Sequence, residues 1–197
     1  MVKSFLDANV IANWMLLDAT ISLEPKQKQD LFKRLSKQVP SYRLLERVNV
    51  ERGLHGTLIT SRVALAEIIS VLFEQALQKK MYDQGIPKYW ERERHSERLS
   101  ESERGDIMTQ VAHFGEVFYE SGKIGYVDDK YAFWDVTPLV LVHRIDEYDA
   151  LLISTAIQEN CKYFITEDKR LRKALTGFPN IKTTSAQNYL TNIIREA

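Results

Sequence analysis

The fold is decided by Val2-Lys3-Ser4-Phe5-Leu6-Asp7-Ala8-Asn9-Val10-Ile11, a stretch near the start of the sequence. A short apolar run stops at an acid, a small residue and an amide, and apolar residues then resume. This pattern predicts a buried strand over 2–6, with Asp7 at its carboxyl end and Asn9 as the N-cap of a helix. Ligands of open α/β sheets bind beyond the carboxyl ends of strands. Asp7 is therefore either a site residue or a second capping group, and the stretch alone leaves both roles open.

Short apolar segments alternate with longer helical ones along the rest of the chain. Strands are expected at 58–60, 138–142, 163–166 and 179–182, with turn and strand character over 125–137. Helices are expected at 10–17, 26–38, 62–80 and 146–157, after Pro40, Ser100, Asp168 and Ser185. This alternation predicts a mostly parallel sheet in a three-layer α/β/α fold. We expect residues 1–197 to form a single domain, with helical or charged additions around 18–57 and 78–130.

Composition narrows the class of protein without naming a partner. Lys plus Arg equals Asp plus Glu, at 27 each, so bulk charge does not draw the chain to nucleic acid, although a local basic groove is compatible. No apolar stretch is long enough to span a bilayer, and the N-terminal run has no secretory pattern. Cys161 is the only cysteine, which excludes an internal disulfide and favours a cytoplasmic location.

Glu67 lies inside the expected helix 62–80, which contains no Gly or Pro. Apolar residues surround this helix on the helical wheel, so we expect it to be heavily buried. An ionised carboxylate in such a place costs on the order of several kcal/mol unless it is compensated. A partner Arg or Lys, a shift to the neutral form, or a bound cation would each compensate it, and the sequence leaves the three open.

Two further acids share the predicted position of Asp7. Asp149 lies in the first turns of the helix 146–157, and Asp168 belongs to the pair Glu167-Asp168 that directly follows the strand 163–166. Because parallel strands end at one edge of a sheet, these carboxylates are expected to converge and to raise one another's pKa unless a cation is present. An oxygen-only site suits Mg²⁺ or Mn²⁺, which can ionise water and assist phosphoryl displacement.

Four segments together resemble the acidic motifs of the PIN domain, the ribonuclease fold shared by VapC-type toxins and many RNA-processing nucleases. They are Phe5-Leu6-Asp7-Ala8-Asn9-Val10, Ala64-Leu65-Ala66-Glu67-Ile68, Asp149-Ala150-Leu151-Leu152 and Phe164-Ile165-Thr166-Glu167-Asp168. The resemblance implies four catalytic metal ligands, Asp7, Glu67, Asp149 and Asp168. It also implies that Asn9 and Thr166 hold the acidic pocket in shape by hydrogen bonds.

The same resemblance implies an activity and partners. The expected activity is Mg²⁺- or Mn²⁺-dependent hydrolysis of mostly single-stranded RNA, leaving a 3′-hydroxyl and a 5′-phosphate. Independently of the resemblance, the expected phosphate-binding side chains are the basic ones next to the proposed metal ligands: Arg62, Arg170, Arg172 and Lys173. The likeness to toxins makes an antitoxin protein and a second copy of the chain candidate partners, with no membrane involved. The extra length at 18–57 and 78–130 fits the simplest toxins poorly, which leaves the toxin role open.

Other interpretations compete with the nuclease. A non-catalytic PIN-like module that binds RNA or protein would use the same fold, although a buried acidic cluster without a use would destabilise it. A phosphatase built on Asp7 would need a second Asp two residues later, where the chain has Asn9. The charged segment 88–104 is typical of a solvated face more than of an RNA-binding surface.

Overall fold

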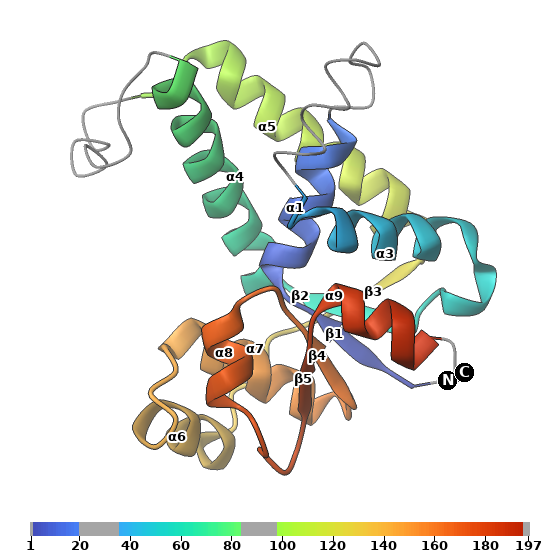
Figure 1. Cartoon of the computed structure of the whole chain (residues 1–197), viewed down its shortest axis with the longest axis vertical. Coiled ribbons are helices and arrows are strands. Elements are labelled where there is room, and N and C mark those ends of the chain that lie inside the picture. Colours follow the sequence, from blue (N-terminus) through green and yellow to red (C-terminus); the bar gives the residue numbers. More distant parts are fainter. Residues whose placement is uncertain (1, 20–35, 84–97, 195–197) are drawn as a thin grey trace.

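A five-stranded parallel sheet forms the centre of the structure, a computed structural model that describes residues 2–19, 36–83 and 98–194 (Figure 1). Its strands are β1 (Ser4–Leu6), β2 (Leu58–Ser61), β3 (Ile124–Val127), β4 (Tyr163–Ile165) and β5 (Lys182–Thr184). They lie in the order β3-β2-β1-β4-β5, and every neighbouring pair is parallel. The order reverses direction at β1, so a topological switch point lies between β1 and β4.

Helices cover both faces of this sheet and complete the three-layer fold expected from the sequence. One face carries α1 (Ala8–Asp18), α3 (Val39–Val50), α4 (Arg62–Asp83), α5 (Glu101–Phe114) and α9 (Ala186–Asn188). The opposite face carries α6 (Phe133–Leu141), α7 (Glu147–Gln158) and α8 (Lys169–Ala174). Figure 1 shows α1, α3, α4 and α5 above the sheet and α6 and α7 below it. π-helical segments continue α5 over Gly115–Glu120 and α9 over Tyr189–Ile193, and a 3₁₀ turn covers Arg52–Leu54.

The central strands are apolar on both sides because both of their faces are covered. Phe5 and Phe164 enter the core under α7, and their rings stack with centroids 5.4 Å apart. Leu6 and Ile165, one residue further along each strand, enter the core under α1. Because the strands are parallel, the residues that follow them all lie at one edge of the sheet, the carboxyl edge.

Several predicted elements are confirmed. β4 falls within the expected strand, β2 extends the expected strand 58–60 by one residue, and α4 and α7 fall at the expected helices. The capping box at the start of α5 is present: Glu103 N donates to Ser100 Oγ at 3.2 Å, and Ser100 N donates to Glu103 Oε2 at 2.6 Å. β5 is an edge strand as expected, but it begins at Lys182 rather than 179.

The strand predicted at 138–142 is wrong, because most of that segment lies in α6. A short, continuously apolar run does not distinguish a buried strand from a buried turn of helix. Pro138 lies inside this helix, while the amide of Val142 donates to the Pro138 carbonyl and keeps the last turn closed.

Other expectations are modified or fall outside the described residues. α4 is less buried than expected, since Ile69 and Phe73 are 46% and 38% exposed. The range 78–130, expected to hold additions, also supplies β3. Most of the helix expected at 26–38 and most of the segment 88–104 lie outside the described residues. None of the described helices is long and apolar enough to cross a membrane.

Candidate functional site

Asp7 lies at the switch point, directly after β1 and beside the end of β4. Its amide donates to the carbonyl of Ile165 at 3.0 Å, and its side chain is buried, with 2% exposure. Asp7 holds the N-cap position of α1 without making a side-chain capping bond, and Asn9 is already the second residue of the helix. The prediction of Asn9 as the N-cap is therefore wrong, because α1 begins at Ala8 and not at Val10. The side-chain amide of Asn9 bonds to other groups instead.

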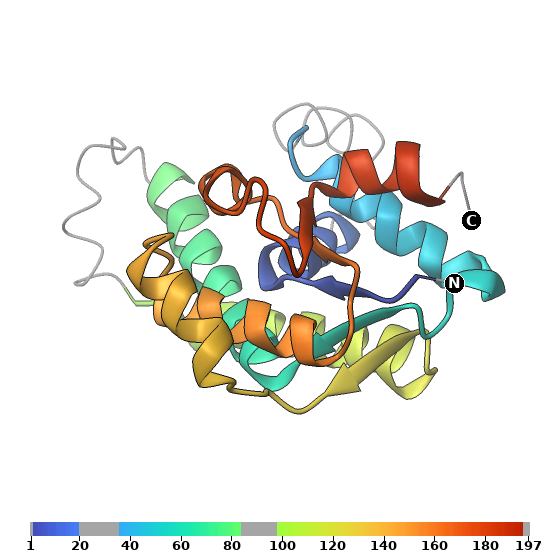
Figure 2. The same cartoon turned by 90° about the horizontal axis from the view of Figure 1, so that it is seen from below.

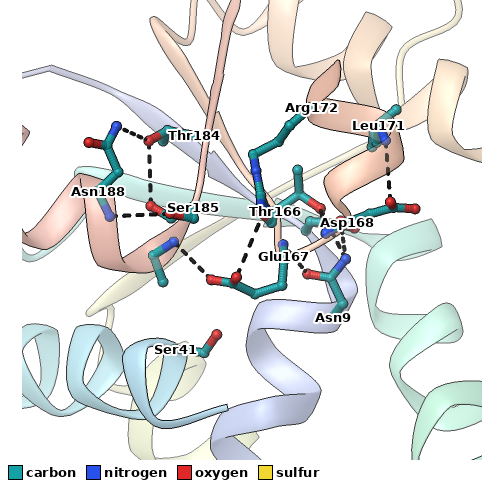
Figure 3. Close-up of polar contacts among 12 residues, drawn as sticks. Asn9, Ser41, Thr166, Glu167, Asp168, Leu171, Arg172, Thr184, Ser185 and Asn188 are labelled. Carbon is teal, nitrogen blue, oxygen red and sulfur yellow. Dashed lines mark hydrogen bonds and ion pairs between the residues drawn. The ribbon is translucent and has the colours of Figure 1, made fainter. Parts of the chain in front are cut away.

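Asn9 joins the ends of β1 and β4 through three hydrogen bonds. Its Nδ2 donates to Asp7 Oδ2 at 2.6 Å. The same Nδ2 donates to Thr166 Oγ1 at 3.0 Å, and its Oδ1 accepts from Glu167 N at 2.9 Å (Figure 3). Thr166 Oγ1 also accepts from Asp168 N at 3.0 Å. These bonds join the two chain segments that carry Asp7 and Asp168. The pocket-supporting role that the resemblance implies for Asn9 and Thr166 stays a prediction.

Glu67 lies in the second turn of α4, the helix that follows β2 without a linker. Its Oε2 is buried and has no hydrogen-bond partner among the described residues. Burial, followed by the negative charges of Asp149 and Asp146, raises the Glu67 pKa to about 7. Of the compensations that the sequence left open, this environment favours a neutral carboxyl or a bound cation over an ion pair.

Asp149 connects the other acids electrostatically. Burial is the main cause that raises its pKa to about 7, and the charges of Asp146, Asp7 and Asp168 act in the same direction. The pKa of Asp7 is also raised to about 7, mainly by burial and in part by Glu67, although its hydrogen bonds with Thr166 and Asn9 oppose the shift. The four predicted ligands therefore influence one another at a single edge of the sheet.

Asp168 and Asp146 also cap helices. Asp168 Oδ1 accepts from the amides of Arg170 and Leu171, at 2.6 and 3.3 Å, at the start of α8. Asp146 Oδ1 accepts from the amides of Tyr148 and Asp149, both at 3.0 Å, at the start of α7. Capping fixes the Asp168 carboxylate at the site, while Asp146 adds negative charge beside Glu67 and Asp149. The sequence gave no signal of this second effect of Asp146.

The donor chemistry suits a divalent cation. The four carboxylates offer only oxygen atoms, which hard cations such as Mg²⁺ and Mn²⁺ prefer, and Glu67 Oε2 is buried without a partner. Across residues 2–19, 36–83 and 98–194, however, no three His, Cys, Asp or Glu side chains gather closely enough to form a ready metal-binding group. The four carboxylates are therefore suitable ligands for a divalent cation by their chemistry and by their place at one sheet edge. In this structure they are too far apart to coordinate one ion together.

The sequence matches the PIN domain family over residues 30–175, most of its length. The chain belongs to the PIN domain family. The matched residues include Glu67, Asp149 and Asp168. Asp7 lies before the matched residues, and the pairing of β1 with β4 brings it to the same edge of the sheet as Asp168. The resemblance stated from the four acidic motifs is thus confirmed, and so is the nuclease-type fold that it implies. A curated protein of Archaeoglobus fulgidus, described as an uncharacterized protein, is 32% identical over 109 residues, or 51% of this chain and 85% of its own length.

The basic side chains near the acids of this PIN domain differ in how they are engaged. Arg172 is mostly buried, and its Nη1 donates to the carbonyl of Thr166 and lies 3.9 Å from Glu167 Oε2. Arg170 and Lys173 are exposed on α8, and the positive charge of Arg170 lowers the Asp149 pKa. Arg172 therefore supports the end of β4, whereas Arg170 and Lys173 are presented to solvent beside the site.

The loop after β3 supplies two acids that the sequence did not single out. Asp129 Oδ2 accepts from Val63 N at 3.0 Å at the start of α4, where Ser61 Oγ also accepts from Ala64 N at 3.5 Å. Asp128 Oδ1 lies 3.0 Å from Arg62 Nη2 in an exposed ion pair. The helix that carries Glu67 is thereby tied to the carboxyl end of β3. The sequence showed only turn and strand character over 125–137, so it did not indicate that Asp128 and Asp129 follow a strand end and contact α4.

Proposed function

We propose that this PIN domain is a metal-dependent endoribonuclease that acts mostly on single-stranded RNA. The observation that supports this function best is that Asp7, Glu67, Asp149 and Asp168 lie at one edge of a parallel sheet, where the charges of neighbouring acids raise the pKa of the first three. Such carboxylates repel one another, and burial strengthens the repulsion, so the site gains by binding a cation. The family to which the chain belongs has a nuclease-type fold, and its members typically cleave RNA with divalent metal.

In this proposal the four carboxylates hold Mg²⁺ or Mn²⁺. When bound, such a cation lowers the pKa of water and stabilises charge on the phosphoryl oxygens. Hydrolysis forms a bond from the water oxygen to phosphorus and breaks the bond from phosphorus to the 3′ oxygen, which leaves a 3′-hydroxyl and a 5′-phosphate. A carboxylate of the cluster accepts the proton that the water loses, and the departing 3′ oxygen takes a proton from solvent.

A cleavage assay tests the proposal directly. The purified protein is incubated with end-labelled single-stranded RNA in Mn²⁺, in Mg²⁺ and in EDTA, with duplex RNA and single-stranded DNA as controls. We expect cleavage of the single-stranded RNA with metal and no cleavage in EDTA. The products should carry a new 5′-phosphate that a phosphatase removes. Binding of RNA without cleavage in either metal would favour the non-catalytic module.

RNA binding is expected to depend on the exposed cations of α8 and to fall gently with salt. Few phosphates can be neutralised beside an acidic site, so the log–log slope should be roughly −2 to −3, at about 0.7 per contact on single strands. Arg170→Ala should weaken binding equally across sequences, because phosphate contacts carry no base information. The measurement is salt-titrated RNA binding to the Asp149→Asn protein, with Arg104→Ala on α5 as the control. An unchanged affinity for Arg170→Ala would move the RNA surface elsewhere.

Arg172→Ala is expected to act on stability instead. Its loss leaves the Thr166 carbonyl without this donor, at a cost of about 1–3 kcal/mol for a hydrogen bond to a charged group. Thermal melting should show a lower midpoint for Arg172→Ala than for Arg170→Ala. Equal midpoints, with RNA affinity lost on Arg172→Ala, would make Arg172 a direct phosphate ligand, as the sequence first suggested.

A toxin role is a finer proposal that rests on the resemblance to VapC-type toxins. It brings an antitoxin protein as a partner, a homodimer as an assembly and a cytoplasmic location. A small antitoxin-like reading frame beside the gene would support it, and neutralisation of the RNase activity by that protein would test it. The balance of basic and acidic residues keeps the non-catalytic module as the alternative.

A further inference from the structure

The chain between β3 and α6 contacts two helices that supply acids to the proposed site. We call residues 128–132 of this chain the β3–α6 loop. Figure 2 shows it, in yellow, passing the start of α4 and running beside α7 before it enters α6. α4 carries Glu67 and α7 carries Asp149, and the two helices also contact each other. The loop therefore bridges the supports of two of the four carboxylates.

Asp129 attaches this loop to the start of α4. Its Oδ2 accepts from Val63 N at 3.0 Å, and its Oδ1 is buried without a hydrogen-bond partner among the described residues. The bond from Ala64 N to Ser61 Oγ in the same turn is longer and weaker, at 3.5 Å. Side chains of a helix point back over the preceding turn, so the Asp129 bond fixes the turn beside the Glu67 carboxyl.

The other end of the loop is attached to α7. Lys130 N donates to Thr155 Oγ1 at 2.9 Å, and Ala132 N donates to Ser154 Oγ at 3.1 Å. Both of these α7 residues are fully buried, and the Thr155 hydroxyl also donates to the Leu151 carbonyl at 2.9 Å. The loop therefore cannot move away from α7 without breaking buried hydrogen bonds, which is costly.

Asp128, the neighbouring acid of the loop, makes a different kind of contact with α4. Its Oδ1 lies 3.0 Å from Arg62 Nη2, and both side chains are more than 70% exposed. Exposed ion pairs of this kind contribute little to stability. The partly buried bond of Asp129 is therefore the stronger of the two attachments to α4.

The placement of α4 against α7 matters because Glu67 and Asp149 repel each other. Burial raises the pKa of Glu67 most, and the charge of Asp149 is the next cause. No three acids of the described residues gather around one point, so their side chains have to close on a cation. Closing on one ion requires that the helices carrying the ligands stay together against this repulsion, and small misplacements of ligands cost affinity.

We propose that Asp129 is a positioning residue of the acidic site. Through Val63 N it holds the first turn of α4 to a loop that is bonded to α7, and so keeps Glu67 close to Asp149. Asp129 acts through its hydrogen bond and is not itself a ligand of the cation. This inference rests on the proposed function, because it takes the four acids as a cation site.

Calorimetry of Mn²⁺ binding to the full chain at pH 8 tests the proposal. We expect Asp129→Ala to bind Mn²⁺ about tenfold more weakly than the wild type, or worse. Asp129→Asn should bind as tightly as the wild type, because its amide oxygen can still accept from Val63 N. Asp128→Ala, which removes a charge from the same loop, should also keep the affinity. Ser100→Ala, which removes the cap of α5, should lower the melting midpoint without changing the affinity.

A second measurement needs no metal. In EDTA at pH 8, Glu67→Gln should raise the melting midpoint, because it removes a buried charge that Asp149 repels. The same substitution should raise the midpoint less in the Asp129→Ala background, where α4 is already free to move away from α7. In the Asp129→Asn background the gain should match that in the wild type, which separates the hydrogen bond of Asp129 from its charge.

The outcomes distinguish this proposal from the nuclease function. Wild-type Mn²⁺ affinity in folded Asp129→Ala would overturn it, and equally weak binding by Asp129→Asn would show that Asp129 acts by its charge. Asp129→Ser, too short to reach Val63 N, replaces Asp129→Ala if that variant does not fold. If the wild type binds Mn²⁺ but leaves RNA uncut, the nuclease function fails and the affinities still decide. If the wild type binds no Mn²⁺, equal gains from Glu67→Gln in all backgrounds would overturn the positioning role, and a smaller gain in Asp129→Ala would support it.

Discussion

Asp7→Asn and Asp149→Asn are each expected to lower RNA cleavage by about a thousandfold or more. A divalent cation supplies several kcal/mol of transition-state stabilisation, and about 4 kcal/mol corresponds to a thousandfold in rate. An amide keeps the shape of the carboxylate but removes the charge that holds the cation. The measurement is single-turnover cleavage of single-stranded RNA at saturating Mn²⁺, with Asp106→Asn on the exposed side of α5 as the matched control.

The fold should survive both substitutions. An Asn at position 7 can still accept from Asn9 Nδ2, and Asn9 keeps its bonds to Thr166 and Glu167, so the link between β1 and β4 is kept. Circular dichroism and melting in EDTA should therefore show a native variant. Cleavage at the wild-type rate by either folded variant would remove that acid from the catalytic set.

The location of the site could be predicted from the sequence because strand ends are strongly signalled. Phe5 and Leu6 end one apolar run and Phe164 and Ile165 end another, and the acids directly follow both. Parallel strands that carry such runs must end at one edge, so Asp7 and Asp168 could be placed together without coordinates. The link made by Asn9 needed the structure, because only the register of β1 against β4 shows which groups its amide reaches.

The features that the sequence missed depend on contacts between distant segments. Nothing local shows that Asp129 caps a helix that begins 67 residues earlier at Arg62, or that Arg172 donates to Thr166. α6 was mistaken for a strand because its apolar residues lie on two sides, one packed in the core and one exposed.

The stability of the metal-free protein is expected to fall as pH rises from about 4 to about 7. The pKa values of Asp7, Glu67 and Asp149 are each raised to about 7, whereas in the unfolded chain these groups titrate near 4. Within this window the folded protein holds protons that the unfolded chain has released, so raising the pH favours unfolding. The total loss should be on the order of a few kcal/mol, because Glu67 and Asp149 are partly exposed and contribute less than a fully buried group.

Divalent metal should restore this stability where the carboxylates are ionised. At pH 8, Mn²⁺ at ~100 times its Kd should add about 2.7 kcal/mol, which raises the melting temperature by roughly 5–10 °C for a chain of this size. At pH 5 protons compete for the same oxygens, so the gain should be small. Asp7→Asn should be more stable than the wild type in EDTA at pH 8, since one repelling charge is gone, and should lose most of the response to Mn²⁺. The measurement is thermal melting at pH 5, 6, 7 and 8 with EDTA or Mn²⁺, and calorimetry gives the Kd. Equal midpoints with EDTA and Mn²⁺ at pH 8, together with no heat of binding, would show that the four acids do not form a metal site.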